Sequence, residues 1–153
     1  MIRRRILPGL SLLPVGLAWA QAMGGPLAEF VPPLTPELKA QLAQADVTAG
    51  AAYFERKCSQ CHDAAKTGGH GKGPHLWGVM GRMAASAPGF AYSAAMKKVG
   101  RAWDYATLDY YLADTAQAVP GRAMDFAGIR DARQRANVVA FLRTLADTPP
   151  PLP

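Results

Sequence analysis

The sequence predicts an all-α domain in which three main helices and one short helix are joined by long loops. Apolar residues recur at helical spacing in three stretches, and each stretch follows a Thr or Asp that can serve as an N-cap. Residues 63–89 contain too many glycines for a helix or a regular sheet, and no stretch alternates as a convincing strand does. A glycine-rich loop of this length is ordinarily either disordered or wrapped around a bound group. The sequence therefore indicates a small helical core completed by a cofactor.

The first half of the chain contains two expected helix starts. Thr35 followed by Pro36 is an N-cap and first-turn pair, which predicts a short helix over residues 36–45. Thr48 is the expected cap of the first main helix, which runs into Cys58 with Phe54 on its apolar face.

Three further helices are expected in the second half. Ser93 begins the short helix over residues 93–99, which Gly100 closes. Asp104 caps the second main helix, and Asp131 caps the third, whose apolar stripe we expect to meet Phe54. The stripe consists of Val138, Phe141, Leu142 and Leu145.

The motif Cys58-Ser59-Gln60-Cys61-His62 is the attachment signature of a covalent c-type haem. Positions i, i+3 and i+4 of a helical turn share one face, so both cysteines can bond a haem vinyl group while His62 points at the iron. The motif predicts one haem c, bonded through Cys58 and Cys61, with His62 as an iron ligand.

A Cys-x-x-Cys pair also fits a thioredoxin-like redox site, a structural disulfide or half of a zinc site. The redox interpretation requires a βαβ pattern, which the flanking sequence does not show. His70 and His75 could complete a zinc set, but the eight residues between Cys61 and His70 are fewer than usual, and His62 would have no role.

The sequence predicts four segments along the chain. Residues 1–20 have the form of a secretory signal peptide, with Arg3-Arg4-Arg5 before an apolar stretch that is shorter than the about 20 residues of a membrane span. We expect cleavage and a periplasmic protein rather than an N-terminal membrane anchor. Residues 21–46 are a Pro/Gly-rich extended lead-in, residues 47–146 the domain, and residues 147–153 a frayed, proline-rich tail.

The net charge of the whole chain is +6. The signal segment carries three of the seventeen basic residues and none of the eleven acidic ones, so the net charge of the remaining chain is +3. A nucleic-acid binder would show its basic residues in a stripe, so this class is not expected. A modest positive charge suits weak, salt-sensitive docking to acidic protein surfaces.

Residues 47–146 resemble the class I c-type cytochromes, the group that includes mitochondrial and soluble bacterial cytochrome c. Beside the haem motif, the resemblance covers Gly50, Phe54, Gly73-Pro74, Gly78, Gly81-Arg82, residues 87–92, Trp103, Tyr111 and residues 119–129. It implies the cytochrome c fold, with the long loops around one covalent haem.

The resemblance also implies that Met124 is the second axial ligand of the iron. From the residues alone Met80, Met83 and Met96 remain alternatives, although Met124 is favoured because it follows a Pro120-Gly121 turn between two helices.

Further site residues are implied by their matching positions. The carbonyl of Pro74 would accept the His62 Nδ1 proton, and the Tyr111 hydroxyl would approach the methionine sulfur. Tyr92 and Trp103 would donate to a buried haem carboxylate, whose charge Arg82 would compensate.

The chain also departs from the mitochondrial pattern. Ala116, Gln117 and Ala123 stand where lysines are usual, and Met96 and His75 stand where asparagines are usual. The basic residues that remain as docking candidates are Lys57, Lys72, Lys97, Lys98, Arg122 and Arg130.

Two protein axial ligands leave no vacant iron position, so the resemblance implies a monomeric one-electron carrier and not an enzyme. Its expected partners are a bc-type complex or a dehydrogenase as donor and an oxidase or a reaction centre as acceptor, through transient contacts with membrane proteins. The alternatives are a haem subunit of a dehydrogenase complex, and a peroxidase-like or gas-binding haem protein if Met124 dissociates easily.

Overall fold

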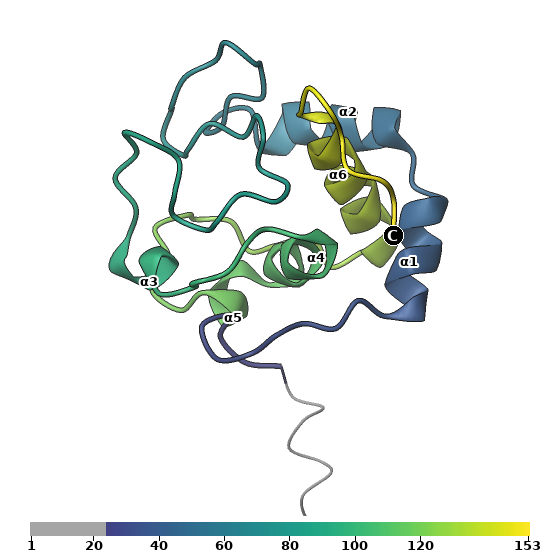
Figure 1. The fold of residues 1–153 in the computed structure, drawn as a ribbon, viewed down its shortest axis with the longest axis horizontal. Helices are drawn as coiled ribbons and strands as arrows, with labels where there is room; N and C mark the ends of the chain where they lie inside the picture. Colours follow the sequence, from purple (N-terminus) through teal and green to yellow (C-terminus); the bar gives the residue numbers. More distant parts are fainter. Residues whose placement is uncertain (1–23) are drawn as a thin grey trace, which may run out of the picture.

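The structure is a computed structural model that describes residues 24–153, and within that range it is all-α, as predicted. The helices are α1 (Pro36–Ala43), α2 (Val47–Lys57), α3 (Ala94–Lys97), α4 (Tyr105–Ala113), α5 (Thr115–Ala118) and α6 (Ala132–Thr144). Figure 1 shows α1, α2 and α6 on one side, and on the other the long loops between α2 and α4, which include α3. In this part of the chain no helix is both long and apolar enough to cross a bilayer. The expected signal peptide lies outside the described residues.

Most helices begin where the sequence predicts. Thr35, Ser93, Asp104 and Asp131 each cap a helix with the side chain. Thr48 was the wrong cap for α2, because the side chain of Asp46 accepts the Ala49 N–H instead (3.0 Å).

Other boundaries also differ from the prediction. The helix expected over residues 36–45 ends at Ala43, and α3 ends at Lys97 before Gly100 adopts a positive φ of 63°. The helix α5 was not predicted, because it is a single turn, capped by Asp114, that is too short to show an apolar period.

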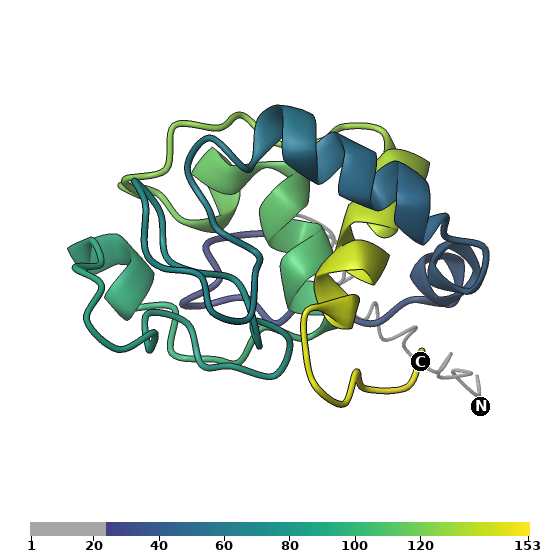
Figure 2. The ribbon, with the colours of Figure 1, turned by 90° about the horizontal axis from the view of Figure 1, so that it is seen from above.

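The crossing of α2 and α6 forms the centre of the helical side (Figure 2). The rings of Phe54 and Phe141 pack with centroids 5.2 Å apart, which confirms the expected contact. The backbones approach so closely that a Cβ on Gly50 would lie 2.0 Å from the carbonyl oxygen of Asn137. The Asn137 side chain in turn accepts the N–H of Asp46 (2.9 Å), so this contact also sets the start of α2.

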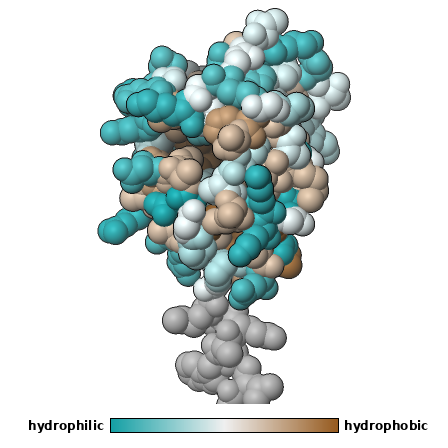
Figure 3. Space-filling model, turned by 90° about the vertical axis from the view of Figure 1, so that its left-hand side faces the viewer, coloured by the Kyte–Doolittle hydropathy of each residue, from teal (hydrophilic) through white to brown (hydrophobic). Residues whose placement is uncertain are grey.

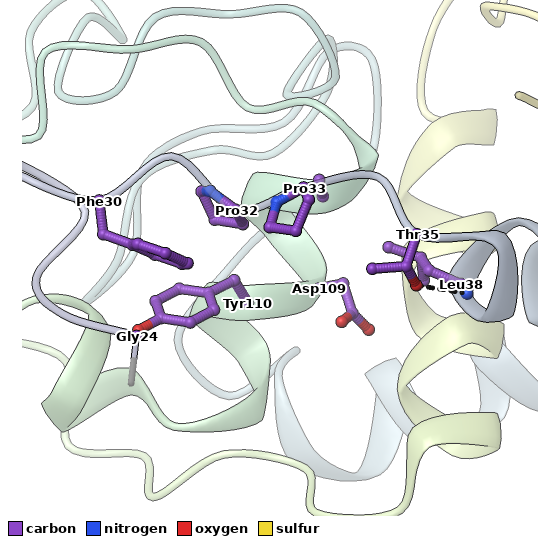
Figure 4. A pocket seen from close by; sticks show the side chains of 9 residues that line it. Gly24, Phe30, Pro32, Pro33, Thr35, Leu38, Asp109 and Tyr110 are labelled. Atoms are coloured by element: carbon purple, nitrogen blue, oxygen red, sulfur yellow. Dashed lines mark hydrogen bonds between the residues drawn. The ribbon is translucent and has the colours of Figure 1, made fainter. Parts of the chain in front are cut away.

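Residues 24–34 form a strap that packs against α4 and α5 rather than a free extended lead-in. Leu27 is fully buried, its N–H donates to the Ala118 carbonyl (2.8 Å), and its own carbonyl accepts from Arg101 Nε (2.8 Å). Phe30 packs on Tyr110, and a pocket of about 260 Å³ remains between the strap and α4 (Figure 4).

The proline-rich tail is docked, so the prediction of a frayed end was wrong. The Tyr105 hydroxyl donates to the Pro151 carbonyl (2.8 Å), and Arg143 Nη1 donates to the Pro150 carbonyl (2.7 Å). Proline lacks an N–H but keeps its carbonyl, so donors elsewhere in the fold can hold such a segment.

Gly50→Ala is expected to lower the free energy of unfolding by about 3 kcal/mol, because the new methyl group forces the α2–α6 crossing apart. Denaturant unfolding of the haem-loaded protein measures this. The matched control is Gly69→Ala, where a Cβ meets nothing within 4 Å, and it should cost nothing. Equal unfolding midpoints for the two variants would show that the close approach is unimportant.

Tyr105→Phe is expected to lower the free energy of unfolding by about 1 kcal/mol, because the tail loses a hydrogen-bond donor. The Leu152 methyl signals in the NMR spectrum should sharpen as the tail becomes mobile. Tyr110→Phe removes a hydroxyl that bonds to Gly25 instead, so the tail signals should not change in that control.

Candidate haem site

The Cys-x-x-Cys-His motif continues the helical path just beyond α2. Cys58 is the C-cap of that helix, and its carbonyl accepts the N–H groups of Cys61 (3.0 Å) and His62 (2.9 Å). Both cysteines are free thiols and half-buried. Two thiols and an imidazole therefore lie together on one turn.

The imidazole of His62 is held in one tautomer. Its Nδ1 lies 2.7 Å from the Pro74 carbonyl oxygen, which can only accept, so Nδ1 carries the proton and Nε2 keeps its lone pair. Burial lowers the pKa of His62, and the bond to Pro74 opposes that shift only partly. A neutral imidazole with a free Nε2 is the form that binds a metal.

Gly73 provides the surface on which this ring lies. A Cβ at Gly73 would be 2.3 Å from Cε1 of His62, and the Gly73 N–H donates to the Cys61 carbonyl (2.8 Å). A pocket of about 470 Å³ opens beside Cys61 and His62.

Met124 lies in the loop between α5 and α6, and its sulfur accepts the Tyr111 hydroxyl (3.8 Å). The loop is fastened on the C-terminal side of Met124, because Thr115 donates to the Phe126 carbonyl and Ile129 donates to the Leu112 carbonyl. Burial raises the pKa of Tyr111 to about 12, so its hydroxyl keeps its proton at neutral pH.

The other three candidate methionines have different surroundings. Met83 is 48% exposed, whereas Met80 and Met96 are partly buried against the apolar core. In residues 24–153 the thioether that accepts a hydroxyl is that of Met124.

The structure brings Arg82, Trp103 and Tyr111 together, with Tyr92 near Arg82. The Trp103 ring packs on Tyr111 with centroids 5.2 Å apart, and the backbone N–H of Trp103 donates to the Arg82 carbonyl (2.9 Å). Burial lowers the pKa of Arg82, and the nearby Tyr92 hydroxyl opposes this. The Arg82 guanidinium donates to the carbonyl of His75 (2.8 Å) and so also ties its own loop together.

The zinc and redox interpretations of the cysteine pair are wrong. His70 Nδ1 accepts the His75 N–H (3.0 Å) and His70 Nε2 donates to the Pro88 carbonyl (2.8 Å), so the ring ties loops together. Over residues 24–153, three or more His, Cys, Asp or Glu side chains nowhere gather closely enough to hold a metal ion. Burial, with the nearby Cys61, raises the pKa of Cys58 to about 11, which is opposite to an activated thiol.

Arg122 is the one docking candidate that differs from the surface role expected of it. Its Nε is buried and has no hydrogen-bond partner in the described chain. The other docking candidates, which are Lys57, Lys72, Lys97, Lys98 and Arg130, are exposed.

The face that carries the loops is hollowed, and Figure 3 shows an apolar interior to the hollow, with apolar and hydrophilic residues around it. A haem requires two thiols, an axial nitrogen, an apolar slot and partners for its two carboxylates. The free cysteines, the His62 ring on bare Gly73 and the unpaired Arg122 Nε meet these needs. The fold and the site together define a haem-binding protein of the c type.

Comparison with known proteins agrees with this class, because the model of the family "Cytochrome c" matches residues 47–146. Cytochrome c of Chlamydomonas reinhardtii is 41% identical over 68% of this chain and 93% of its own length. Cytochrome c2 of Rhodomicrobium vannielii is 44% identical over 67% of this chain and 81% of its own. "Cytochrome c-type cyt cy" of Rhodobacter capsulatus is 41% identical over 74% of this chain, but over only 56% of its own length. The chain belongs to the cytochrome c family, so it binds haem c through Cys58 and Cys61 and carries electrons.

Gly73→Ala is expected to lower the ratio of bound haem to protein, because the new methyl group displaces the His62 ring from its position. The alkaline pyridine spectrum of the purified protein measures that ratio. Gly69→Ala in the same loop is the control, and it should load fully. Full loading of both variants, with unchanged low-spin spectra, would contradict the role of Gly73.

Proposed function

We propose that the protein is a periplasmic one-electron carrier with a single haem, and that His62 Nε2 and Met124 Sδ are the axial ligands of its iron. The observation that carries this proposal is the His62 ring, which Pro74 holds with Nε2 free beside two unpaired thiols. The Met124 assignment is supported by the Tyr111 hydroxyl, which donates to that sulfur.

The haem supplies one-electron redox chemistry, and the protein controls it. A ligand set that is complete on both sides keeps water and small substrates off the iron, which favours electron transfer over catalysis. The thioether raises the reduction potential relative to harder ligands. The Tyr111 hydroxyl draws electron density from the sulfur and so also raises the potential.

The residues around the ligands have supporting roles in this proposal. Pro74 orients the imidazole, and Tyr111 orients the thioether. Tyr92, Trp103 and Arg82 surround a haem carboxylate, which is consistent with the Trp103–Arg82 backbone pairing and the proximity of Tyr92 to Arg82.

The proposal includes export and the four segments of the sequence. Residues 1–20 would be a cleaved signal peptide, residues 21–46 the lead-in, residues 47–146 the haem domain and residues 147–153 the tail. The basic n-region and short apolar stretch support cleavage over a retained anchor. The first residues of the purified protein, read by N-terminal sequencing, distinguish the two.

The partners proposed are a bc-type complex or a dehydrogenase as donor and an oxidase or a reaction centre as acceptor. Lys57, Lys72, Lys97, Lys98 and Arg130 are exposed, which supports brief electrostatic contacts. Purification as a free monomer fits a shuttle, whereas a stoichiometric complex would indicate a subunit of a dehydrogenase.

Met124→Ala is the test of the axial ligand. The oxidised protein should show the long-wavelength charge-transfer band of methionine-ligated haem, and the reduced protein should not bind carbon monoxide at neutral pH. The variant should lose the band, bind carbon monoxide and turn over peroxide, because an iron position becomes vacant.

Met83→Ala is the matched control and should leave the band intact, because Met83 is exposed. Carbon monoxide binding by the unmodified reduced protein would contradict the closed site. Peroxide turnover by the unmodified protein at the rate of Met124→Ala would support the peroxidase-like alternative.

A further inference from the structure

Arg122 lies directly after the turn that leads into the Met124 loop. Its N–H closes that turn on the Val119 carbonyl (3.0 Å), and Gly121 before it has a positive φ of 82°. The Nε atom is buried without a partner, and Nη2 reaches only the Phe126 carbonyl, at 3.4 Å. The guanidinium is therefore partly buried and poorly satisfied by the chain itself.

Two other partly buried arginines have compensation that Arg122 lacks. Arg135 pairs with the carboxylate of Asp109 (2.6 Å). Arg143 also has a buried, unpaired Nε, but it lies in the last turn of α6, where the helix dipole favours a positive charge. In residues 24–153 neither of the two ion pairs includes Arg122.

The charge of Arg122 lies near the Tyr111 hydroxyl. It acts on the Tyr111 hydroxyl, where it lowers the pKa and so partly offsets the effect of burial. That hydroxyl donates to the Met124 sulfur (3.8 Å). Arg122, Tyr111 and Met124 are thus one connected group, and the free Nε belongs to it.

We propose that the guanidinium of Arg122 is the counter-ion of a carboxylate of the bound haem, and that this pair raises the reduction potential. A partly buried positive charge is stabilised by a negative partner, and the described chain supplies no carboxylate for Arg122. Haem c brings two carboxylates into the same slot, and a guanidinium matches a carboxylate in shape and charge. This inference rests on the proposed function and adds Arg122 to the residues around Arg82.

The expected effect on the potential has a definite sign. A fixed positive charge in a medium of low dielectric constant stabilises the reduced haem, whereas an unpaired carboxylate stabilises the oxidised haem. Loss of the Arg122 charge therefore lowers the potential on both counts.

The test is a spectroscopic redox titration of the haem-loaded Arg122→Gln variant. At a fixed solution potential the ratio of reduced to oxidised protein should fall about tenfold, which equals about 59 mV for one electron. Arg130→Gln removes the same charge from an exposed position, and solvent screening should leave its potential close to that of the unmodified protein. Equal shifts in the two variants would overturn the proposal.

Arg122→Lys provides the second measurement, and it remains decisive if Arg122→Gln fails to load haem. It keeps the charge but loses the planar fork, so most of the potential should be retained. The carboxylate bands in the redox-induced infrared difference spectrum should nevertheless shift. Unchanged carboxylate bands, or a potential as low as that of a haem-loaded Arg122→Gln, would overturn the proposal.

The unmodified protein separates this inference from the proposed function. If it lacks thioether haem or the methionine band, the proposed function fails. If it shows both, while Arg122→Gln behaves like Arg130→Gln, only the role of Arg122 fails.

Discussion

The hydrogen bond between His62 Nδ1 and the Pro74 carbonyl requires a long stretch of irregular chain to return to α2 at one defined point. The loop achieves this by bonding to itself and to the helices. Leu76 donates to the Asp63 carbonyl (2.9 Å), and Gly78 donates to the Leu145 carbonyl at the end of α6 (2.6 Å). These bonds hold a segment without regular secondary structure at defined points of the fold. Gly73 is part of the same constraint, because only a residue without a side chain allows the ring to lie there.

The helices also position the residues of the haem site. The crossing of α2 and α6 sets the direction in which α2 delivers Cys58, and Gly50 permits the close approach. The chain beyond α4 then carries Met124 on a loop whose C-terminal part is bonded to α4 and α5. Two loops of unrelated sequence are thus oriented by one small set of packed helices.

The haem motif and most helix starts could be predicted from neighbouring residues in the sequence. The haem motif and four of the helix caps depend on residues within a few positions of one another, and the structure keeps those caps at Thr35, Ser93, Asp104 and Asp131. The α2 cap could not be chosen in this way. Asp46 and Thr48 are both good caps, and the choice depends on Asn137 of α6, which binds the Asp46 N–H.

The local sequence could not predict the packing of the strap, the docking of the tail or the burial of the Arg122 Nε. Their positions depend on donors and acceptors far away in the sequence, such as Arg101 for Leu27 and Tyr105 for Pro151. Neither segment has an apolar period that would indicate burial. An arginine next to a turn normally lies in solvent, and only the packed loop shows that its Nε does not.

The strap has a consequence for the opposite end of the domain. Leu27 bonds to Ala118, the last residue of α5, and Thr115 at the start of α5 bonds to Phe126 beyond Met124. A mechanical path therefore runs from the N-terminal segment through one helical turn to the thioether. The position of Leu27 thereby bears on the thioether, although some ninety residues of chain separate the two.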